Sequence, residues 1–226
     1  RMRSLTEAMR GLLYYTAGQV DRGDIGDAAA KARAEVLVPM LKAWATDTGI
    51  EVASLGIQVH GGMGFVEETG AAQHFRDARI APIYEGTNGI QAADLVTRKL
   101  GLENGEVLQA LFADIARDAG EEAQLQALAG ECAAIAKWMR EDASLDDRLA
   151  GSVPFTTMCA VAVAGWCLTK QHAALTESDD TQRAHAKKVT MRFILDHIVP
   201  EAIGLKASAT AGAALLYELD GSVLAA

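Results

Sequence analysis

The sequence predicts an all-α protein made of two successive helical bundles. Half of its 226 residues are hydrophobic but only 5% are aromatic, so alanine, leucine, valine and isoleucine carry the apolar share. This composition favours helices. Apolar residues recur with helical spacing along most of the chain, and we find neither a confident strand pattern nor an internal repeat.

The first helix is expected over residues 4–20. Ser4 and Glu7 have the spacing of a capping box, which would satisfy free backbone N–H groups at the start of the helix. The apolar face of this helix consists of Leu5, Ala8, Leu12 and Tyr15. A turn from Gly23 to Gly26 then separates it from the next helix.

The second helix is expected over residues 27–48. Its apolar face consists of Val36, Leu37, Met40, Leu41 and Trp44. Gly49 would end the helix as a C-terminal cap. Pro39 lies inside the same span and should kink the helix or shift its hydrogen bonds.

Residues 50–60 leave two alternatives open. They could form a short helix or, because Ile57 and Val59 alternate with other residues, a short strand. A strand would make the following Gly62 and Gly64 similar to a dinucleotide-binding turn. The third glycine of that motif and the surrounding βαβ unit are missing, which argues against the nucleotide-fold interpretation.

A short charged helix is expected over residues 67–79. Its side chains available for ion pairs are Arg76, Asp77 and Arg79. Pro82 breaks the chain, and a loop then leads into a helix over residues 88–100. Thr87 or Asn88 would be the N-cap of this helix, so its first N–H groups would point toward the end of the loop.

The second half of the chain begins with a turn at Asn104 and Gly105. Alanine-rich helices are expected after it, over residues 106–143, 153–176 and 179–219, the last with a break near Pro200. Ser152 with Pro154 would start the second of these helices, and Ser178, followed by two aspartates, would start the third.

Charge and cysteine content limit the class of protein. The net charge of −9 and a pI of about 5.0 argue against nucleic acid as the main partner. No apolar run approaches the roughly 20 residues that span a bilayer, so we expect no membrane segment and a cytoplasmic location. Three cysteines without a CxxC pair predict buried free thiols, with no disulfide framework and no metal site.

The densest run of glycines surrounds an isolated acid, Glu85, which stands between Tyr84 and Gly86. Six glycines interrupt helical sequence in this region: Gly61, Gly62, Gly64, Gly70, Gly86 and Gly89. Glycine is favoured where the backbone must turn or let another group come close. This stretch is therefore predicted to be a functional site.

The same stretch resembles the C-terminal helical domain of FAD-dependent acyl-CoA dehydrogenases. The resemblance rests on three motifs in the same order: Gln58-Val59-His60-Gly61-Gly62, Arg76-Asp77-Ala78-Arg79 and Ile83-Tyr84-Glu85-Gly86-Thr87. The implied C-terminal dehydrogenase domain covers residues 1–103. Residues 104–226 resemble, more loosely, the extra helical domain of a longer subgroup, which includes enzymes acting on 3-methylmercaptopropionyl-CoA.

The resemblance implies a role for each site residue. Glu85 would be the catalytic base that removes the α-proton of an acyl-CoA, its N–H would polarise the thioester carbonyl, and Gly86 would leave room for the substrate. Two groups would bind FAD: Thr87, Asn88 and Gly89 after the base, and Gln58, Val59, His60, Gly61 and Gly62 at the flavin of a neighbouring subunit. The family often has glutamine where this chain has Gly89, so only a backbone contact is expected there.

The resemblance also implies partners and an overall activity. These are an acyl-CoA substrate, an electron-transferring flavoprotein as electron acceptor, and a homodimer or homotetramer. The N-terminal helical domain and the middle β-domain of the family have no counterpart here. The chain is therefore expected to be a fragment that by itself neither holds FAD nor turns over. The alternative is a non-catalytic helical module for oligomerisation or interaction.

Overall fold

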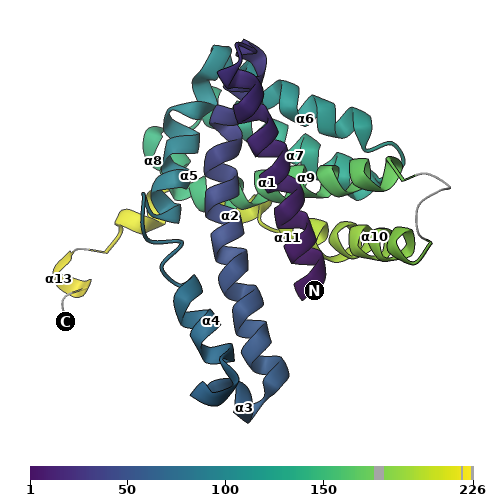
Figure 1. Ribbon diagram of the computed structural model, residues 1–226. Coiled ribbons are helices and arrows are strands. Elements are labelled where there is room, and N and C mark those ends of the chain that lie inside the picture. Colours follow the sequence, from purple (N-terminus) through teal and green to yellow (C-terminus); the bar gives the residue numbers. More distant parts are fainter. Residues whose placement is uncertain (176–180, 220, 225–226) are drawn as a thin grey trace.

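The computed structural model describes residues 1–175, 181–219 and 221–224. These residues contain helices and no strand, so the predicted all-α fold class is confirmed (Figure 1). The elements of the first half are α1 (Met2–Asp24), α2 (Ala28–His60), α3 (Gly62–Phe65), η1 (Glu67–Thr69), α4 (Ala71–Ala78), α5 (Asn88–Thr97) and η2 (Lys99–Gly105). Those of the second half are α6 (Glu106–Asp118), α7 (Ala123–Glu141), α8 (Leu145–Ala150), α9 (Ser152–Ala173), α10 (Thr181–Phe193), η3 (Ile194–Ile198), α11 (Val199–Ile203), α12 (Lys206–Ala209), η4 (Ala214–Tyr217) and α13 (Gly221–Leu224).

Helix α1 begins before its predicted start. Ser4 is buried inside the helix and does not cap it, so the predicted capping box with Glu7 is wrong. Arg1, at the N-cap position, instead donates to Glu51 at 2.6 Å and to Glu201 at 2.7 and 2.9 Å. These ion pairs hold the first turn of α1 against Glu51 of α2 and Glu201 of α11. The predicted apolar face is confirmed by Leu5, Ala8 and Leu12, which are buried, and Tyr15, which is half-buried.

Helix α2 runs without interruption to His60. The predicted end at Gly49 is wrong, and residues 50–60 are helical, so the strand alternative is wrong as well. A glycine inside a helix costs about 1 kcal/mol relative to alanine. The packing of α2 against α1, α4 and α5 offsets that cost along its length. Pro39 lies on the buried face, and the same helix continues on both sides of it.

The second half divides more finely than predicted. The prediction of a single helix over residues 106–143 is wrong, because Gly120, with φ of +58°, lies between α6 and α7. The turn at Asn104 and Gly105 is confirmed, with φ values of +58° and +86°. Helix α9 begins at Ser152 as predicted, although the Ser152 hydroxyl donates to Leu149 O and does not cap the helix.

The last helices follow the predicted break. The expected start at Ser178 lies outside the described residues. The break near Pro200 is confirmed, because α10 passes into the wider π-helical turn η3 just before this proline. Proline has no backbone N–H, so it cannot donate the hydrogen bond that an α-helix needs at its position. In a π-helical turn the hydrogen bonds span five residues instead of four, so a different carbonyl is left without a donor.

Helix α9 lies at the centre of one hydrophobic core. Leu37 of α2 and Phe155 of α9 both belong to that core, so helices on either side of the predicted domain boundary at residue 103 contribute to it. The boundary itself stays a prediction. The prediction of buried free thiols is confirmed for Cys132, Cys159 and Cys167.

Helix α9 differs from the expectation that no apolar run is long enough to span a bilayer. Among the described residues, α9 is long and apolar enough to cross a membrane. Of its most apolar window, 78% is buried inside the structure. Neighbouring helices on several sides, including α1, α2, α5 and α7, explain why nearly all of its faces are apolar.

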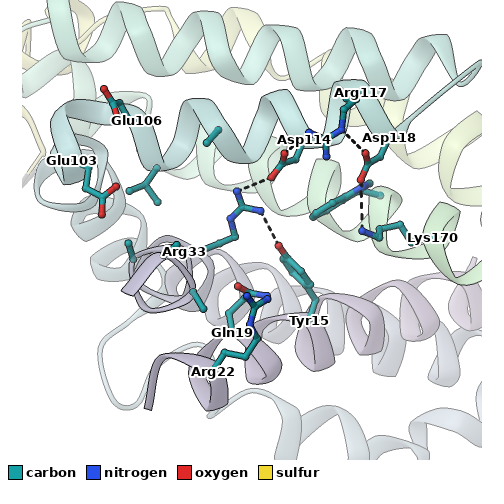
Figure 2. A pocket seen from close by; sticks show the side chains of 16 residues that line it. Tyr15, Gln19, Arg22, Arg33, Glu103, Glu106, Asp114, Arg117, Asp118 and Lys170 are labelled. Carbon is teal, nitrogen blue, oxygen red and sulfur yellow. Dashed lines mark hydrogen bonds and ion pairs between the residues drawn. The ribbon is translucent and has the colours of Figure 1, made fainter. Parts of the chain in front are cut away.

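An ionic cluster joins α1, α2 and α6 beside a cavity of about 490 Å³ (Figure 2). Arg33 of α2 donates to Tyr15 Oη at 3.2 Å and pairs with Asp114 at 2.7 Å. Burial opposes the ionisation of Asp114, but hydrogen bonds from Arg33 and Arg117 outweigh it and lower the pKa of this carboxyl. The cluster therefore stabilises the packing of the first helices on the second half of the chain.

We predict that Arg33→Met lowers the free energy of unfolding by about 1–3 kcal/mol, because Asp114 and Tyr15 lose a partly buried donor. The lowered pKa of Asp114 adds a pH dependence. Its stabilisation is complete above the unfolded pKa of roughly 4 and is lost as the pH falls through the lower folded pKa. The stability difference between wild type and variant should therefore shrink in acid, as measured by urea denaturation at neutral and acidic pH.

The matched control is Arg22→Met. Arg22 lines the same cavity, but its side chain is 60% exposed and pairs with Asp27. An exposed ion pair contributes about 0–1 kcal/mol. Equal losses for the two variants would contradict a special role for Arg33.

Candidate functional site

The predicted catalytic loop connects α4 to α5 and is closed by backbone and side-chain hydrogen bonds. Asn88 N donates to Pro82 O at 3.0 Å. Thr87 Oγ1 accepts from Ile90 N at 3.3 Å, so Thr87 is the N-cap of the two predicted candidates, Thr87 and Asn88. The loop therefore enters α5 in one defined conformation, which fixes the backbone of the two residues before the cap.

Glu85 has a left-handed backbone conformation in this loop, with φ of +55°, and Gly86 follows at +87°. For a residue other than glycine this conformation costs about 1–2 kcal/mol. The Glu85 side chain is exposed, and the neighbouring Tyr84 and Ile90 are 56% and 62% exposed. The loop thus presents one carboxylate at the edge of an apolar surface. Backbone strain of this kind clusters at functional sites.

Asn88 anchors the loop to α2. Its Oδ1 accepts from Lys42 Nζ at 2.9 Å and from Thr46 Oγ1 at 3.1 Å, and its Nδ2 donates to Ala43 O at 2.9 Å. Lys42 Nζ also donates to Gly86 O at 2.6 Å. Both polar atoms of the Asn88 side chain are therefore hydrogen-bonded to other residues of the chain. Lys42 and Thr46 were not predicted as site residues; their signal in the sequence is two polar residues one helical turn apart beside an apolar face.

The second predicted group lies at the far end of α2. Gln58, Val59 and His60 form the last turn of the helix, and all three are exposed. His60 Nδ1 is 2.8 Å from Gly56 O, so this ring nitrogen is in hydrogen-bond contact within the last turn of the helix. Gly61, with φ of +61°, ends the helix and turns the chain into α3.

The glycines at this end have different reasons for lacking a side chain. A Cβ added to Gly64 would clash with Ile57 O, so packing within the chain requires glycine there. A Cβ added to Gly61 or Gly62 would meet no atom within 4 Å. At Gly61 the positive φ favours glycine, whereas at Gly62 neither packing nor φ requires it. The open backbone at Gly62 fits the close approach of an external group such as a pyrophosphate.

The structure does not bring the two predicted groups together. Lys42, which holds the Glu85 loop, and Gln58 lie in the same helix. At a rise of ~1.5 Å per residue they are about 24 Å apart along its axis. Figure 1 shows α3 at the end of α2 remote from α5. Within this chain Glu85 and the Gln58–Gly62 segment therefore lie at separate places along α2.

Two family models match the chain, one in each half. The family model described as "Acyl-CoA dehydrogenase, C-terminal domain" matches residues 1–100, and the model described as "Acetyl-CoA dehydrogenase C-terminal like" matches residues 107–220. The chain belongs to the acyl-CoA dehydrogenase family. The resemblance inferred from the three motifs is thereby confirmed.

Individual relatives agree with this assignment. The chain is 39% identical over 228 residues to the 3-methylmercaptopropionyl-CoA dehydrogenase of Ruegeria pomeroyi, covering 89% of this chain and 38% of that protein. An acyl-CoA dehydrogenase of Bacillus anthracis complexed with FAD superimposes with a TM-score of 0.74 at 17% identity, over 98% of this chain and 42% of that one. For Caenorhabditis elegans ACDH-11 in complex with C11-CoA the TM-score is 0.68 at 20% identity, over 87% of this chain and 35% of that one. The chain thus spans between 35% and 42% of the length of these family members.

We predict that Glu85→Gly stabilises the protein although it removes the carboxylate. Glycine adopts positive φ without steric strain, so the free energy of unfolding should rise by about 1 kcal/mol. Chemical denaturation measures this change. The control is Glu68→Gly, an exposed glutamate without positive φ, which should destabilise slightly. A loss of stability at position 85 would contradict the strained conformation.

We predict that Gly62→Ala leaves the fold intact and lowers the FAD content of the purified full-length protein. Its added methyl group meets nothing within the chain but would occupy the space open to an external group. Gly64→Ala is the matched control and should destabilise the protein by about 1–3 kcal/mol, because its methyl group clashes with backbone. Full FAD content in stable Gly62→Ala protein would count against a flavin contact at this glycine.

Proposed function

We propose that the protein carrying this chain oxidises an acyl-CoA to a trans-2-enoyl-CoA in an FAD-dependent reaction, with Glu85 as the catalytic base. Family membership supports the reaction class. The observation that carries the assignment of the base is the strained backbone of Glu85, held in a loop that Asn88 and Lys42 tie to α2. A backbone fixed in this way keeps the direction of the Glu85 Cα–Cβ bond while a substrate binds.

The chemistry explains why a carboxylate is needed. The α-proton of a thioester is too weakly acidic for water to remove at a useful rate, and a positioned base lowers that barrier. An acyl chain lying over Tyr84 and Ile90 would exclude water from Glu85. The Glu85 backbone N–H would stabilise the charge that develops on the thioester oxygen. When bound, FAD would accept the hydride from the β-carbon.

Two parts of the chain would hold FAD. The exposed backbone from Gln58 to Gly62 can approach the adenosine diphosphate half, and the open space at Gly62 supports that fit. At the start of α5, the amide of Asn88 is engaged within the chain, whereas the Thr87 hydroxyl accepts from Ile90 N and keeps its O–H free to donate. A contact there would come from the Thr87 O–H or through backbone, including the exposed Gly89.

The separation of these two parts supports an assembly of several subunits. Because about 24 Å of helix lies between them, the end of α2 would serve the flavin of a neighbouring subunit in a homodimer or homotetramer. The substrate would be an acyl-CoA, and an electron-transferring flavoprotein would reoxidise the flavin.

The test is Glu85→Gln in the full-length, FAD-loaded protein. We expect the rate of anaerobic flavin bleaching by an acyl-CoA to fall about 10²–10⁴-fold, because the amide cannot take up the proton. Binding of the acyl-CoA, followed by the perturbation of the flavin spectrum, should persist because the two side chains have nearly the same shape.

Glu68→Gln serves as the control, since Glu68 is an exposed acid in the separate η1 segment. Its bleaching rate should equal that of wild type. Unchanged bleaching in Glu85→Gln would overturn the assignment of the base. A full-length protein without FAD and without response to any acyl-CoA would favour the non-catalytic interaction module.

A further inference from the structure

A basic cleft lies between α1 and α10, and none of its lining residues belongs to the Glu85 loop. Its cavity of about 350 Å³ is bordered by Arg3 and Arg10 of α1 and by Arg183 and Lys187 of α10. Glu7 is the one acid among the described residues that line it. Four cations therefore surround one carboxylate, in a chain whose net charge is −9.

Glu7 alone cannot neutralise four cations, so part of the positive charge of the cleft has no acidic partner among the described residues. Lys187 pairs with Glu7 and also donates to Gln171 Oε1 at 3.1 Å. Arg3 lies 3.9 Å from the same Glu7, with a side chain that is 69% exposed. In the part of the chain that the structure describes, neither Arg10 nor Arg183 makes an ion pair or side-chain hydrogen bond.

Apart from the contacts of Lys187 and Arg3 with Glu7, these cations add no ion pair that stabilises the fold within the described residues. Arg183 and Lys187 are one turn apart on α10, where like charges destabilise a helix. Arg3 and Arg10 lie on the same side of α1, about 10 Å apart along its axis. Guanidinium groups bind phosphate oxygens through two parallel hydrogen bonds. The spacing is too long for a single phosphate and suits an anion with more than one phosphate group.

An aromatic side chain continues the row of cations. Tyr14 lies one turn after Arg10, lines the same cleft and is 71% exposed. Exposed aromatic rings beside basic side chains are platforms on which nucleic-acid bases stack. We propose that this cleft binds a nucleoside polyphosphate, with its phosphates between the arginines of α1 and α10 and its base on Tyr14. The proposal does not depend on the dehydrogenase reaction.

Free nucleotides and coenzyme A share this chemistry, because coenzyme A contains a phosphorylated adenosine diphosphate. The experiment therefore titrates the full-length, FAD-loaded protein separately with ADP, coenzyme A, pyrophosphate and inorganic phosphate, by calorimetry. The key variant is the double substitution Arg10→Gln, Arg183→Gln, which removes both unpaired cations. ADP binding at this cleft should weaken about tenfold or more, since each phosphate loses a charge-assisted contact.

Two further variants separate a binding role from a structural one. Glu7→Gln removes the carboxylate that faces the anion, so ADP binding should become tighter, whereas a role in folding alone would not strengthen it. Lys188→Gln is the matched control, because Lys188 is exposed on α10 and does not line the cleft. It should bind ADP as wild type does. Circular dichroism checks that all variants are folded.

The order of ligand affinities distinguishes coenzyme A from a free nucleotide as the ligand of the cleft. Tighter binding of coenzyme A than of ADP, lost in the double variant, would support the proposal with coenzyme A as the source of the nucleotide; the reverse order would support it with a free nucleotide. Tyr14→Leu should weaken ADP binding and leave pyrophosphate binding unchanged. Wild-type ADP affinity in the double variant, or equal affinities for ADP and inorganic phosphate, would overturn the proposal.

Discussion

The uninterrupted course of α2 is the constraint on which the rest of the structure depends. One side of this helix contributes Leu37 and Met40 to the core, its middle holds the Glu85 loop through Lys42, and its end carries the Gln58–Gly62 segment. A helix is stiff over this length, so it sets the distance between the two predicted parts of the site. A break at Gly49 would have let that distance vary.

The loop around Glu85 shows how a strained conformation is maintained. A left-handed glutamate would relax if the loop were held only by its own turns. The contacts of Asn88 with α2 prevent this, because they satisfy both the amide oxygen and the amide nitrogen of one side chain. A residue that the motif associates with a cofactor therefore also has a structural role. At position 85 the left-handed backbone that presents the carboxylate therefore also lowers the stability of the folded protein.

The second half of the chain is packed into the same core as the first. Helix α9 is nearly all apolar because it is covered on several sides, and Arg33 of α2 pairs with Asp114 of α6 beside a cavity. The packing of α10 beside α1 creates a surface that neither half has alone. The cations of the basic cleft come from both helices, and they face each other because α10 contacts α1.

The sequence by itself determined the helical class, the family and several local signals. Thr87 caps α5, and Asn104 and Gly105 form a turn, because these depend on side chains and backbone freedom within a few residues. Tertiary structure alone decided that α2 passes through Gly49. Packing against other helices outweighs a local preference of about 1 kcal/mol. The partners of Asn88 and, within the described residues, the lack of an ion pair at Arg10 and Arg183 were likewise set by residues far apart in the chain, whose proximity no local pattern encodes.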